Sequence, residues 1–312
     1  MPTRPPLIIC LLLFAMIAAF FAVNHTAVAQ TPNKQHPSYT SGSQTSREFG
    51  VMTNSLDMRR KPAATVASIM KKIGYSSVAI SCKPEQFDEA IKAYRKAGIR
   101  VGAVYVALTT DGKSVSFNIP IESVFEQLRD TGAVVMIHTH AAKGVTVSDD
   151  RLAEQFLALA KKAEKAGVTI AIYPHVGYRL TTLEAAVRIA DKVNHPSLGV
   201  CFTLCHYLRQ NDARDLPRKL RAARNRLKLV TINGSATGNT RAMQWNMLIQ
   251  PIDQGDFDLE RLMELLGVDL KYNGPIFVQC YKLKAPARTI LQDTFNRWRE
   301  LRRHCDKYNH ST

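Results

Sequence analysis

The chain has 312 residues, of which 46% are hydrophobic, 8% are aromatic and 22% are charged. With only 16 Gly and 14 Pro, this composition excludes collagen-like, low-complexity and wholly disordered chains and indicates a globular protein with a large core. The charge is unusual, because 42 Lys and Arg against 26 Asp and Glu give a formal net charge of +16. That value first suggests nucleic acid or another anionic surface as a partner.

The first 29 residues have the pattern of a secretory signal peptide. Arg4 supplies a positive start, residues 7–23 form an uninterrupted apolar run, and the Ala-Val-Ala sequence at 27–29 is a small-residue cleavage site. We therefore expect a secreted or periplasmic protein, with an uncleaved membrane anchor as the alternative. Residues 30–47 are rich in Ser, Thr, Gln and Asn and are typical of a flexible leader. No later stretch is apolar enough to cross a membrane.

An odd number of cysteines follows the signal peptide. Several of them lie in apolar, strand-like runs, where cysteine usually behaves as a small buried hydrophobic residue. We therefore expect no disulfide framework among the five, which are Cys82, Cys201, Cys205, Cys280 and Cys305.

From residue 48 onward, short apolar runs rich in β-branched residues alternate with longer amphipathic stretches. The runs predict eight strands, at residues 49–56, 77–81, 101–108, 133–137, 169–173, 199–204, 227–232 and 275–279. The stretches between and after them predict eight helices, at residues 62–73, 86–97, 121–130, 150–166, 183–193, 216–226, 259–266 and 288–302. This α/β alternation favours a single (β/α)8 TIM barrel over residues 48–304, followed by a tail at 305–312, rather than an open doubly wound sheet. The longest connection, residues 235–257, is expected to be a functional loop.

Polar side chains stand at the ends of five consecutive predicted strands. In a TIM barrel the carboxyl ends of the strands form the active-site face, so we expect these side chains to lie close together. Neutral imidazoles there can serve as acid and base groups or hold a divalent metal. The residues are His138 and His140 on the fourth strand, Tyr173 and His175 on the fifth, Thr203 and His206 on the sixth, Thr231 and Asn233 on the seventh, and Gln279 and Tyr281 on the eighth.

Three motifs and the order of the elements resemble the xylose isomerase-like superfamily, over about residues 48–304. The motifs are Lys-Lys-Ile-Gly-Tyr at 71–75, Cys-Phe-Thr-Leu-Cys-His at 201–206 and Gly-Asp-Phe-Asp at 255–258. This superfamily includes sugar isomerases and epimerases and the endonuclease IV type of apurinic endonucleases. The resemblance therefore implies a barrel that acts on a small-molecule sugar or on damaged DNA.

The chain departs from the superfamily at the metal site. Members that epimerise sugars usually bind a metal through Glu, Asp, His and Glu, and the resemblance places these ligands at Tyr173, Thr203, Thr231 and Gln279 of this chain. None of the four replacements is an anionic or imidazole ligand, which removes the charge that holds a hard cation. Only His138 and His206 match additional ligand positions of the endonuclease branch.

These observations lead to three functional hypotheses. The first is an exported carbohydrate isomerase or epimerase that abstracts a proton next to a sugar carbonyl, with isomerisation, epimerisation or elimination as the outcome. The second is a sugar-binding barrel that has lost its chemistry, and the third, which the missing ligands disfavour, is an apurinic endonuclease. In the first, His138, His175 and His206 are catalytic, a zinc-like metal is held by His138, His140, His175 and His206, and the sugar is bound by Tyr173, Asn233, Trp245, Gln279 and Tyr281.

The basic charge is concentrated away from the predicted site. Residues 208–228 and 281–312 carry most of it, and both segments belong mainly to helices of the outer ring. We therefore interpret the charge as an outer coating, which does not favour nucleic acid as the partner.

Overall fold

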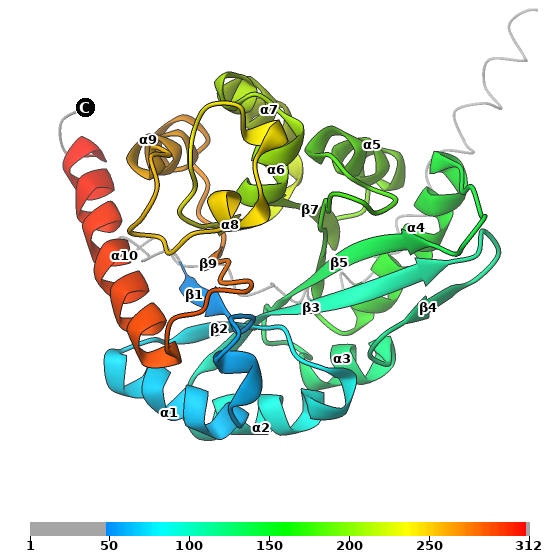
Figure 1. Cartoon of the computed structure of the whole chain (residues 1–312). Coiled ribbons are helices and arrows are strands. Elements are labelled where there is room, and N and C mark those ends of the chain that lie inside the picture. The colour runs from blue at the N-terminus through cyan, green and yellow to red at the C-terminus, as the bar shows by residue number, and fades with distance from the viewer. Residues whose placement is uncertain (1–47, 310–312) are drawn as a thin grey trace, which may run out of the picture. The chain divides into compact units, whose positions relative to one another are not determined.

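Eight parallel strands close into a barrel with helices around it (Figure 1). The computed structural model describes residues 48–309, with side chains to residue 304. The strands of the barrel are β1 (Phe49–Met52), β2 (Ser77–Ile80), β3 (Arg100–Thr110), β5 (Val134–Ala141), β6 (Thr169–Ile172), β7 (Leu198–Thr203), β8 (Leu227–Ile232) and β9 (Ile276–Val278). Each pairs in parallel with the next, and β9 returns to β1 with Phe49 opposite Ile276 and Val51 opposite Val278. The prediction of a TIM barrel is therefore confirmed.

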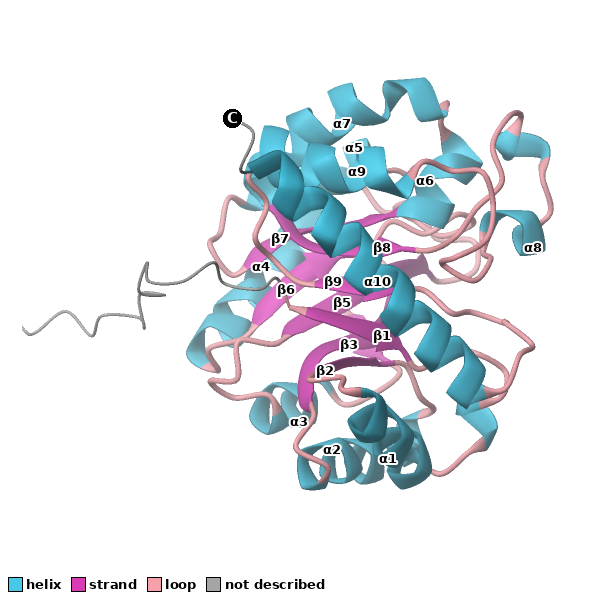
Figure 2. Ribbon diagram, turned by 90° about the vertical axis from the view of Figure 1, so that its left-hand side faces the viewer, coloured by secondary structure: helices cyan, strands magenta, loops and turns pink. Residues whose placement is uncertain are grey.

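The strands lie in the middle of the fold, and the helices lie outside them (Figure 2). The principal outer helices are α1 (Ala63–Ile73), α2 (Phe87–Lys96), α3 (Ile121–Gln127), α4 (Asp149–Lys165), α5 (Leu183–Val193), α7 (Leu216–Ala223), α9 (Leu259–Glu264) and α10 (Ala287–Asn309). Their boundaries follow local signals: Thr182 caps α5 by accepting from the backbone N–H of Ala185, and Gly74 ends α1 in the left-handed conformation. These helices correspond to the eight that the sequence predicts.

The barrel strands are buried on both faces, because their side chains alternate between two cores. One set points into the barrel and includes Met136, Cys201 and Phe277. The other set, which includes Val135 and Ile137, packs against the helices. Two-sided burial explains why the strands read as continuous apolar runs in the sequence.

Several elements differ from those predicted, mainly at the carboxyl ends of the strands. Strand β3 is extended to Thr110 and pairs with an antiparallel strand, β4 (Val115–Phe117), through a hairpin. Strand β5 continues to Ala141, so His138 and His140 lie within it rather than after it. Strand β1 ends at Met52, and the residues after it form a loop that continues into a short 3-10 helix, Met58–Arg60.

Two short helices that the sequence did not predict lie near the carboxyl ends of the strands. Helix α6 (Leu204–Gln210) begins directly after β7, and α8 (Trp245–Leu248) lies within the predicted loop at 235–257. Helix α9 is followed by a π turn at Leu265–Asp269. Helix α10 continues to Asn309, beyond the expected barrel end at residue 304.

The predicted signal peptide at 1–29, the leader at 30–47 and the Cys305 side chain lie outside the described residues. Within the described part, Cys82, Cys201, Cys205 and Cys280 are free thiols. No helix between residues 48 and 309 combines the length and the hydrophobicity that a membrane span requires. On the outer ring, Arg221 of α7 pairs with Asp269 and Arg297 of α10 pairs with Glu260, so part of the basic charge is compensated there.

Candidate functional site

A cavity of about 460 Å³ opens at the carboxyl ends of the barrel strands. Its volume suits a small organic molecule. The wall, as far as the structure describes the chain, contains no carboxylate side chain. It holds three histidines (His138, His175 and His206), five large aromatic residues (Tyr105, Tyr173, Tyr178, Trp245 and Tyr281) and two cations (Arg59 and Lys282).

His138 and His140 form a hydrogen-bonded pair on β5. They are alternate residues of the strand and share a face, which places Nδ1 of His138 at 3.0 Å from Nε2 of His140. His138 is buried and stacks on Tyr105, with ring centroids 4.5 Å apart, whereas His140 is half-buried. His140 is not part of the cavity wall, but it contacts two wall residues, His138 and Tyr178.

His175 and His206 lie side by side, and the backbone of Val176 hydrogen-bonds to both rings. Their ring centroids are 4.0 Å apart. Nδ1 of His175 donates to the carbonyl oxygen of Val176 at 2.8 Å, and Nδ1 of His206 accepts from the N–H of the same residue at 3.4 Å. A neutral imidazole carries one proton, so His175 has its proton on Nδ1 and His206 has its proton on Nε2. Nε2 is consequently an acceptor in His175 and a donor in His206.

Burial lowers the pKa of all four histidines. Desolvation, reinforced by the neighbouring imidazoles, lowers the pKa of His138 to about 3, and desolvation lowers the pKa of His175 to about 4. The same causes lower the pKa of His206 well below its usual range, and desolvation lowers the pKa of His140. The four imidazoles are therefore neutral at pH 7, and no carboxylate in the wall favours their charged forms.

The positions that match the superfamily's metal ligands hold neutral groups, and most of these bond to one another. The Tyr173 hydroxyl lies 3.0 Å from Thr203 Oγ1 and accepts from Gln279 Nε2 at 3.2 Å. The Gln279 carbonyl oxygen accepts from Asn54 Nδ2 and from the backbone N–H of Tyr281. Thr231 is fully buried, and its hydroxyl has no partner among the described residues. These four side chains, of which Tyr173 and Gln279 line the cavity, carry no charge that could hold a hard cation.

The predicted zinc-like site does not fit this arrangement either. Because Nδ1 of His206 accepts from the Val176 N–H, its Nε2 carries the proton and has no lone pair for a metal. Within residues 48–304, no three His, Cys, Asp or Glu side chains are placed to hold a metal ion together. The sequence prediction of a metal held by the four histidines is therefore not supported by their geometry.

The predicted sugar-binding residues fall into three groups. Trp245 and Tyr281 are partly exposed on the cavity wall, and Trp245 meets His206 edge-on with ring centroids 5.2 Å apart. Tyr173 and Gln279 also line the cavity, but their polar atoms already bond to the protein. Asn233 is fully buried outside the cavity wall, where its amide nitrogen donates to the carbonyls of Gly234 and Leu248. Asn233 therefore fixes the loop that carries Trp245 rather than lining the cavity.

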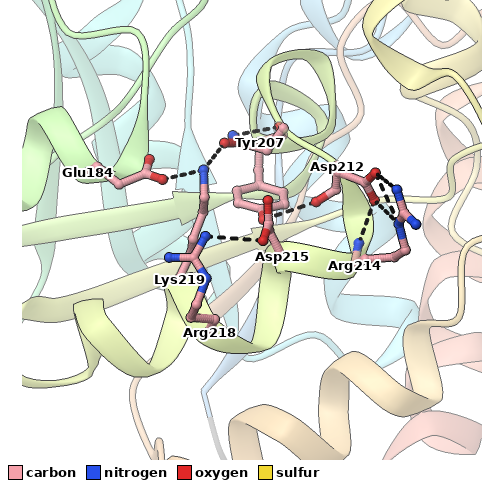
Figure 3. A network of polar contacts seen from close by, with 8 residues as sticks. Glu184, Tyr207, Asp212, Arg214, Asp215, Arg218 and Lys219 are labelled. Atoms are coloured by element: carbon pink, nitrogen blue, oxygen red, sulfur yellow. Dashed lines mark hydrogen bonds and ion pairs between the residues drawn. The ribbon is translucent and has the colours of Figure 1, made fainter.

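A polar network joins helix α6, which carries His206, to the neighbouring helices α5 and α7 (Figure 3). The Lys219 ammonium bonds to Glu184 of α5 and to the side chain of Asn211, which in turn donates to the Tyr207 carbonyl. The Tyr207 hydroxyl donates to the backbone carbonyl of Asp212 at 3.3 Å. These contacts join α5, α6 and α7, so they fix the helix on which His206 stands.

Several residues of the site were not singled out by sequence reasoning. Tyr178 stacks on His175 with ring centroids 3.9 Å apart and an interplanar angle of 9°, and Tyr105 stacks on His138. The signal for Tyr178 is its place in the same strand-end loop as His175, three positions later. Arg59 and Asn54 follow β1, where the predicted strand was too long and concealed a loop.

The barrel and its strand-end cavity define an enzyme-like TIM barrel, and the comparisons with known proteins give the family. The sequence model described as "Xylose isomerase-like TIM barrel" matches residues 68–301, so the chain belongs to that family. No curated protein sequence matches the chain.

Solved structures share the fold at low sequence identity. A 3-keto-D-glucoside 4-epimerase from E. coli is 18% identical with a TM-score of 0.60, over 82% of this chain and 99% of that one. The IolI protein with a bound zinc atom is 16% identical with a TM-score of 0.63, over 84% and 99%. A fusion of a xylose isomerase-like TIM barrel with a 4-hydroxyphenylpyruvate dioxygenase is 16% identical with a TM-score of 0.64, over 83% of this chain, which spans 43% of the fusion's length.

Proposed function

We propose that the chain is a sugar isomerase or epimerase that transfers a proton at the carbon next to a carbonyl, using neutral histidines. The main support for this proposal is the pair His175 and His206. Both rings line the same cavity, and their hydrogen bonds give them different tautomers. Membership of the xylose isomerase-like family and the similarity to a 3-keto-D-glucoside 4-epimerase support a sugar as the substrate. This chemistry is derived from imidazoles alone, because the residues present do not fit a metal.

His175 acts as the base and His206 as the hydrogen-bond donor. Nε2 of His175 takes the proton from the carbon beside the carbonyl, and the electrons of that C–H bond move to form an enolate. The N–H at Nε2 of His206 donates to the carbonyl oxygen, where the negative charge develops. Isomerisation follows when the proton held on His175 is returned to the former carbonyl carbon, while the hydroxyl proton on the carbon that was deprotonated moves to the former carbonyl oxygen. Epimerisation follows when a second acid protonates the original carbon from the opposite face and the abstracted proton stays on His175.

His138 and His140 supply a second proton carrier in this proposal. His138 borders the cavity, and its ring centroid lies 6.0 Å from that of His175. Its hydrogen bond connects the cavity with His140, which is half-buried and lies nearer the carboxyl end of β5. In this proposal the pair delivers a proton to the face of the substrate opposite His175.

Aromatic side chains provide surfaces for a sugar ring. Trp245 and Tyr281 are partly exposed on the wall, and Tyr178 stacks on His175 beside them. The apolar faces of pyranose rings pack against such aromatic groups.

Deuterium wash-in tests the proposal. Purified protein is incubated in heavy water with aldoses, ketoses and 3-keto sugars, and incorporation at carbon is followed by proton NMR and mass spectrometry. We expect incorporation next to the carbonyl of at least one sugar, together with the appearance of an isomer or epimer. The absence of exchange on every sugar would overturn the enzymatic proposal.

A sugar-binding barrel without chemistry is the second candidate. The neutral network of Tyr173, Thr203 and Gln279 favours it, because this network replaces the family's charged metal ligands. Saturable sugar binding without any exchange at carbon would identify this function.

A further inference from the structure

We propose that the sugar is anionic, and that Arg59 and Lys282 bind its carboxylate or phosphate group. This inference rests on the proposed function and specifies the class of substrate. Both side chains line the same cavity as the histidines. A guanidinium and an ammonium that border one cavity can both bind either anion, since both donate hydrogen bonds and carry positive charge.

The fold brings the two cations to one side of the cavity mouth. Arg59 lies in the 3-10 helix that follows β1, and Lys282 follows β9, the neighbouring strand in the barrel. Backbone hydrogen bonds tie the two loops together: Lys282 donates to the Asn54 carbonyl at 3.4 Å, and Leu56 donates to the Leu283 carbonyl at 3.1 Å. The two positions are therefore fixed relative to each other by the backbone.

Neither cation has a carboxylate partner among the side chains that the structure describes. Lys61, in the same loop as Arg59, pairs with Asp57 at 3.3 Å, which leaves that carboxylate engaged. The Lys282 ammonium lies 5.3 Å from the ring centroid of Tyr281, itself a wall residue. Two uncompensated cations on an acid-free wall give the cavity a positive potential, which favours a negatively charged ligand.

The backbone at Lys282 is also unusual. Its φ of 59° lies in the left-handed region, which a lysine rarely adopts, and its N–H is bonded to Asn54. Such conformations persist where surrounding contacts impose them, and they cluster at ligand sites. This observation is independent of the charge and points to the same loop.

The geometry separates the anion from the reacting carbon. Strand β1 lies across the barrel from β6, after which His175 stands, and β9 lies across from β5, which carries His138. His206 follows β7, which is two strands from β9. A sugar that spans the cavity can therefore place its anionic group against Arg59 and Lys282 while its carbonyl faces the histidines. The cations set orientation as well as affinity.

The test compares binding of charged and neutral sugars by isothermal titration calorimetry. The probes are D-glucuronate and D-galacturonate for a carboxylate, D-glucose 6-phosphate for a phosphate, and D-glucose and D-galactose as neutral counterparts. We expect at least one anionic probe to bind about tenfold or more tightly than its neutral counterpart, with a preference that weakens as salt is added. The stronger of the carboxylate and phosphate arms identifies the group.

A double variant and a matched control localise the effect. R59Q/K282Q is expected to remove the preference for the anion, so that the charged sugar and its neutral counterpart bind about equally. R60Q/K284Q removes two exposed cations from the same loops that do not line the cavity, and it is expected to keep the preference. Thermal unfolding of each variant verifies that it folds.

The outcomes separate this inference from the proposed function. Equal or tighter binding of the neutral sugars, no binding of any anionic probe, or equal losses in the two double variants would overturn the anionic substrate. Exchange at carbon with neutral sugars alone would overturn it too, while supporting proton transfer. Preferential binding of an anion without any exchange would instead support the anion site and count against the enzymatic proposal.

Discussion

The rings of His175 and His206 lie 4.0 Å apart and hydrogen-bond to opposite polar groups of the same residue, Val176. His175 donates to its carbonyl, and His206 accepts from its N–H. The backbone therefore assigns a different tautomer to each imidazole, without help from a carboxylate. In many enzymes a carboxylate performs this task for a catalytic histidine.

The first prediction concerns these tautomers directly. In protein labelled with ¹⁵N-histidine, NMR at pH 7 should show His175 protonated at Nδ1 and His206 protonated at Nε2, because Val176 supplies one acceptor and one donor. His175→Gln and His206→Gln assign the two signals. The same tautomer at both positions would contradict the acid and base roles given to them.

The second prediction is kinetic. Replacing His175 with Gln should reduce proton exchange into substrate by about 10²- to 10⁴-fold, the range typical of a lost general base. The affinity for substrate should change much less. His195→Gln is the matched control, because His195 lies just before β7, at the amino-terminal end of that strand, and bonds to the Ser197 N–H. A comparable loss of exchange in both variants would show that the effect is not specific to the cavity.

The third prediction follows because the histidines of the cavity do not fit a metal ion. Dialysis against a strong chelator should leave the exchange rate and the unfolding temperature within error of the untreated protein, because the Nε2 atom of His206 carries a proton and cannot ligate. Elemental analysis before and after dialysis gives the metal content. Activity that disappears on dialysis and returns with zinc would contradict the tautomer of His206.

The fourth prediction is a loss of stability in mild acid. The pKa of His138 is about 3 and that of His175 is about 4 in the folded protein, whereas an unfolded histidine has a pKa of about 6.5. Between these values the unfolded chain binds more protons than the folded one, so the free energy of unfolding decreases as the pH falls. Each histidine contributes a slope of up to about 1.4 kcal/mol per pH unit in this window.

Denaturant titrations at several pH values between 7 and 4 measure this slope. His138→Asn should make the slope shallower, because one depressed pKa is removed. A slope that is unchanged in this variant would show that His138 is solvated and titrates normally.

The fifth prediction concerns the support of helix α6. Replacing Lys219 with Met should reduce the free energy of unfolding by about 1–2 kcal/mol, because Glu184 and Asn211 lose a largely buried partner. Lys192→Met is the control, since its pair with Asp150 is more exposed and should be worth less than about 0.5 kcal/mol. Chemical denaturation measures both, and equal effects would mean that the network does not hold the helix.

The sequence predicted the barrel, whereas the finer geometry of the cavity could not be predicted. Of the four histidines that the sequence grouped together, three line the cavity and His140 does not. Alternation of apolar runs with amphipathic stretches is a direct result of burying strands between two cores, so the eight units could be counted. His138, His175 and His206 could be grouped because strand ends share one face. Helix α6 was missed because Leu204 continues the apolar run of β7 directly into the helix.

The role of Val176 could not be predicted, since a backbone N–H and carbonyl have no sequence signature. The direction of the Asn233 amide depends on the loop that returns over it, and Gly234 shows how tightly that loop packs: a side chain there would clash with the carbonyls of Pro251 and Gln254. Side-chain identity thus located the site, whereas the backbone determined which groups reach the cavity.

The absence of carboxylates from the described cavity wall has a consequence for the strength of the base. The basicity of His175 depends on the charge of whatever occupies the cavity, because the wall provides no fixed negative group. A neutral ligand that displaces water would weaken the imidazole further, whereas a bound anion would strengthen it by stabilising the imidazolium. Charged and neutral ligands would then differ in the rate of proton transfer as well as in affinity. The charge of the substrate itself would set the basicity of His175.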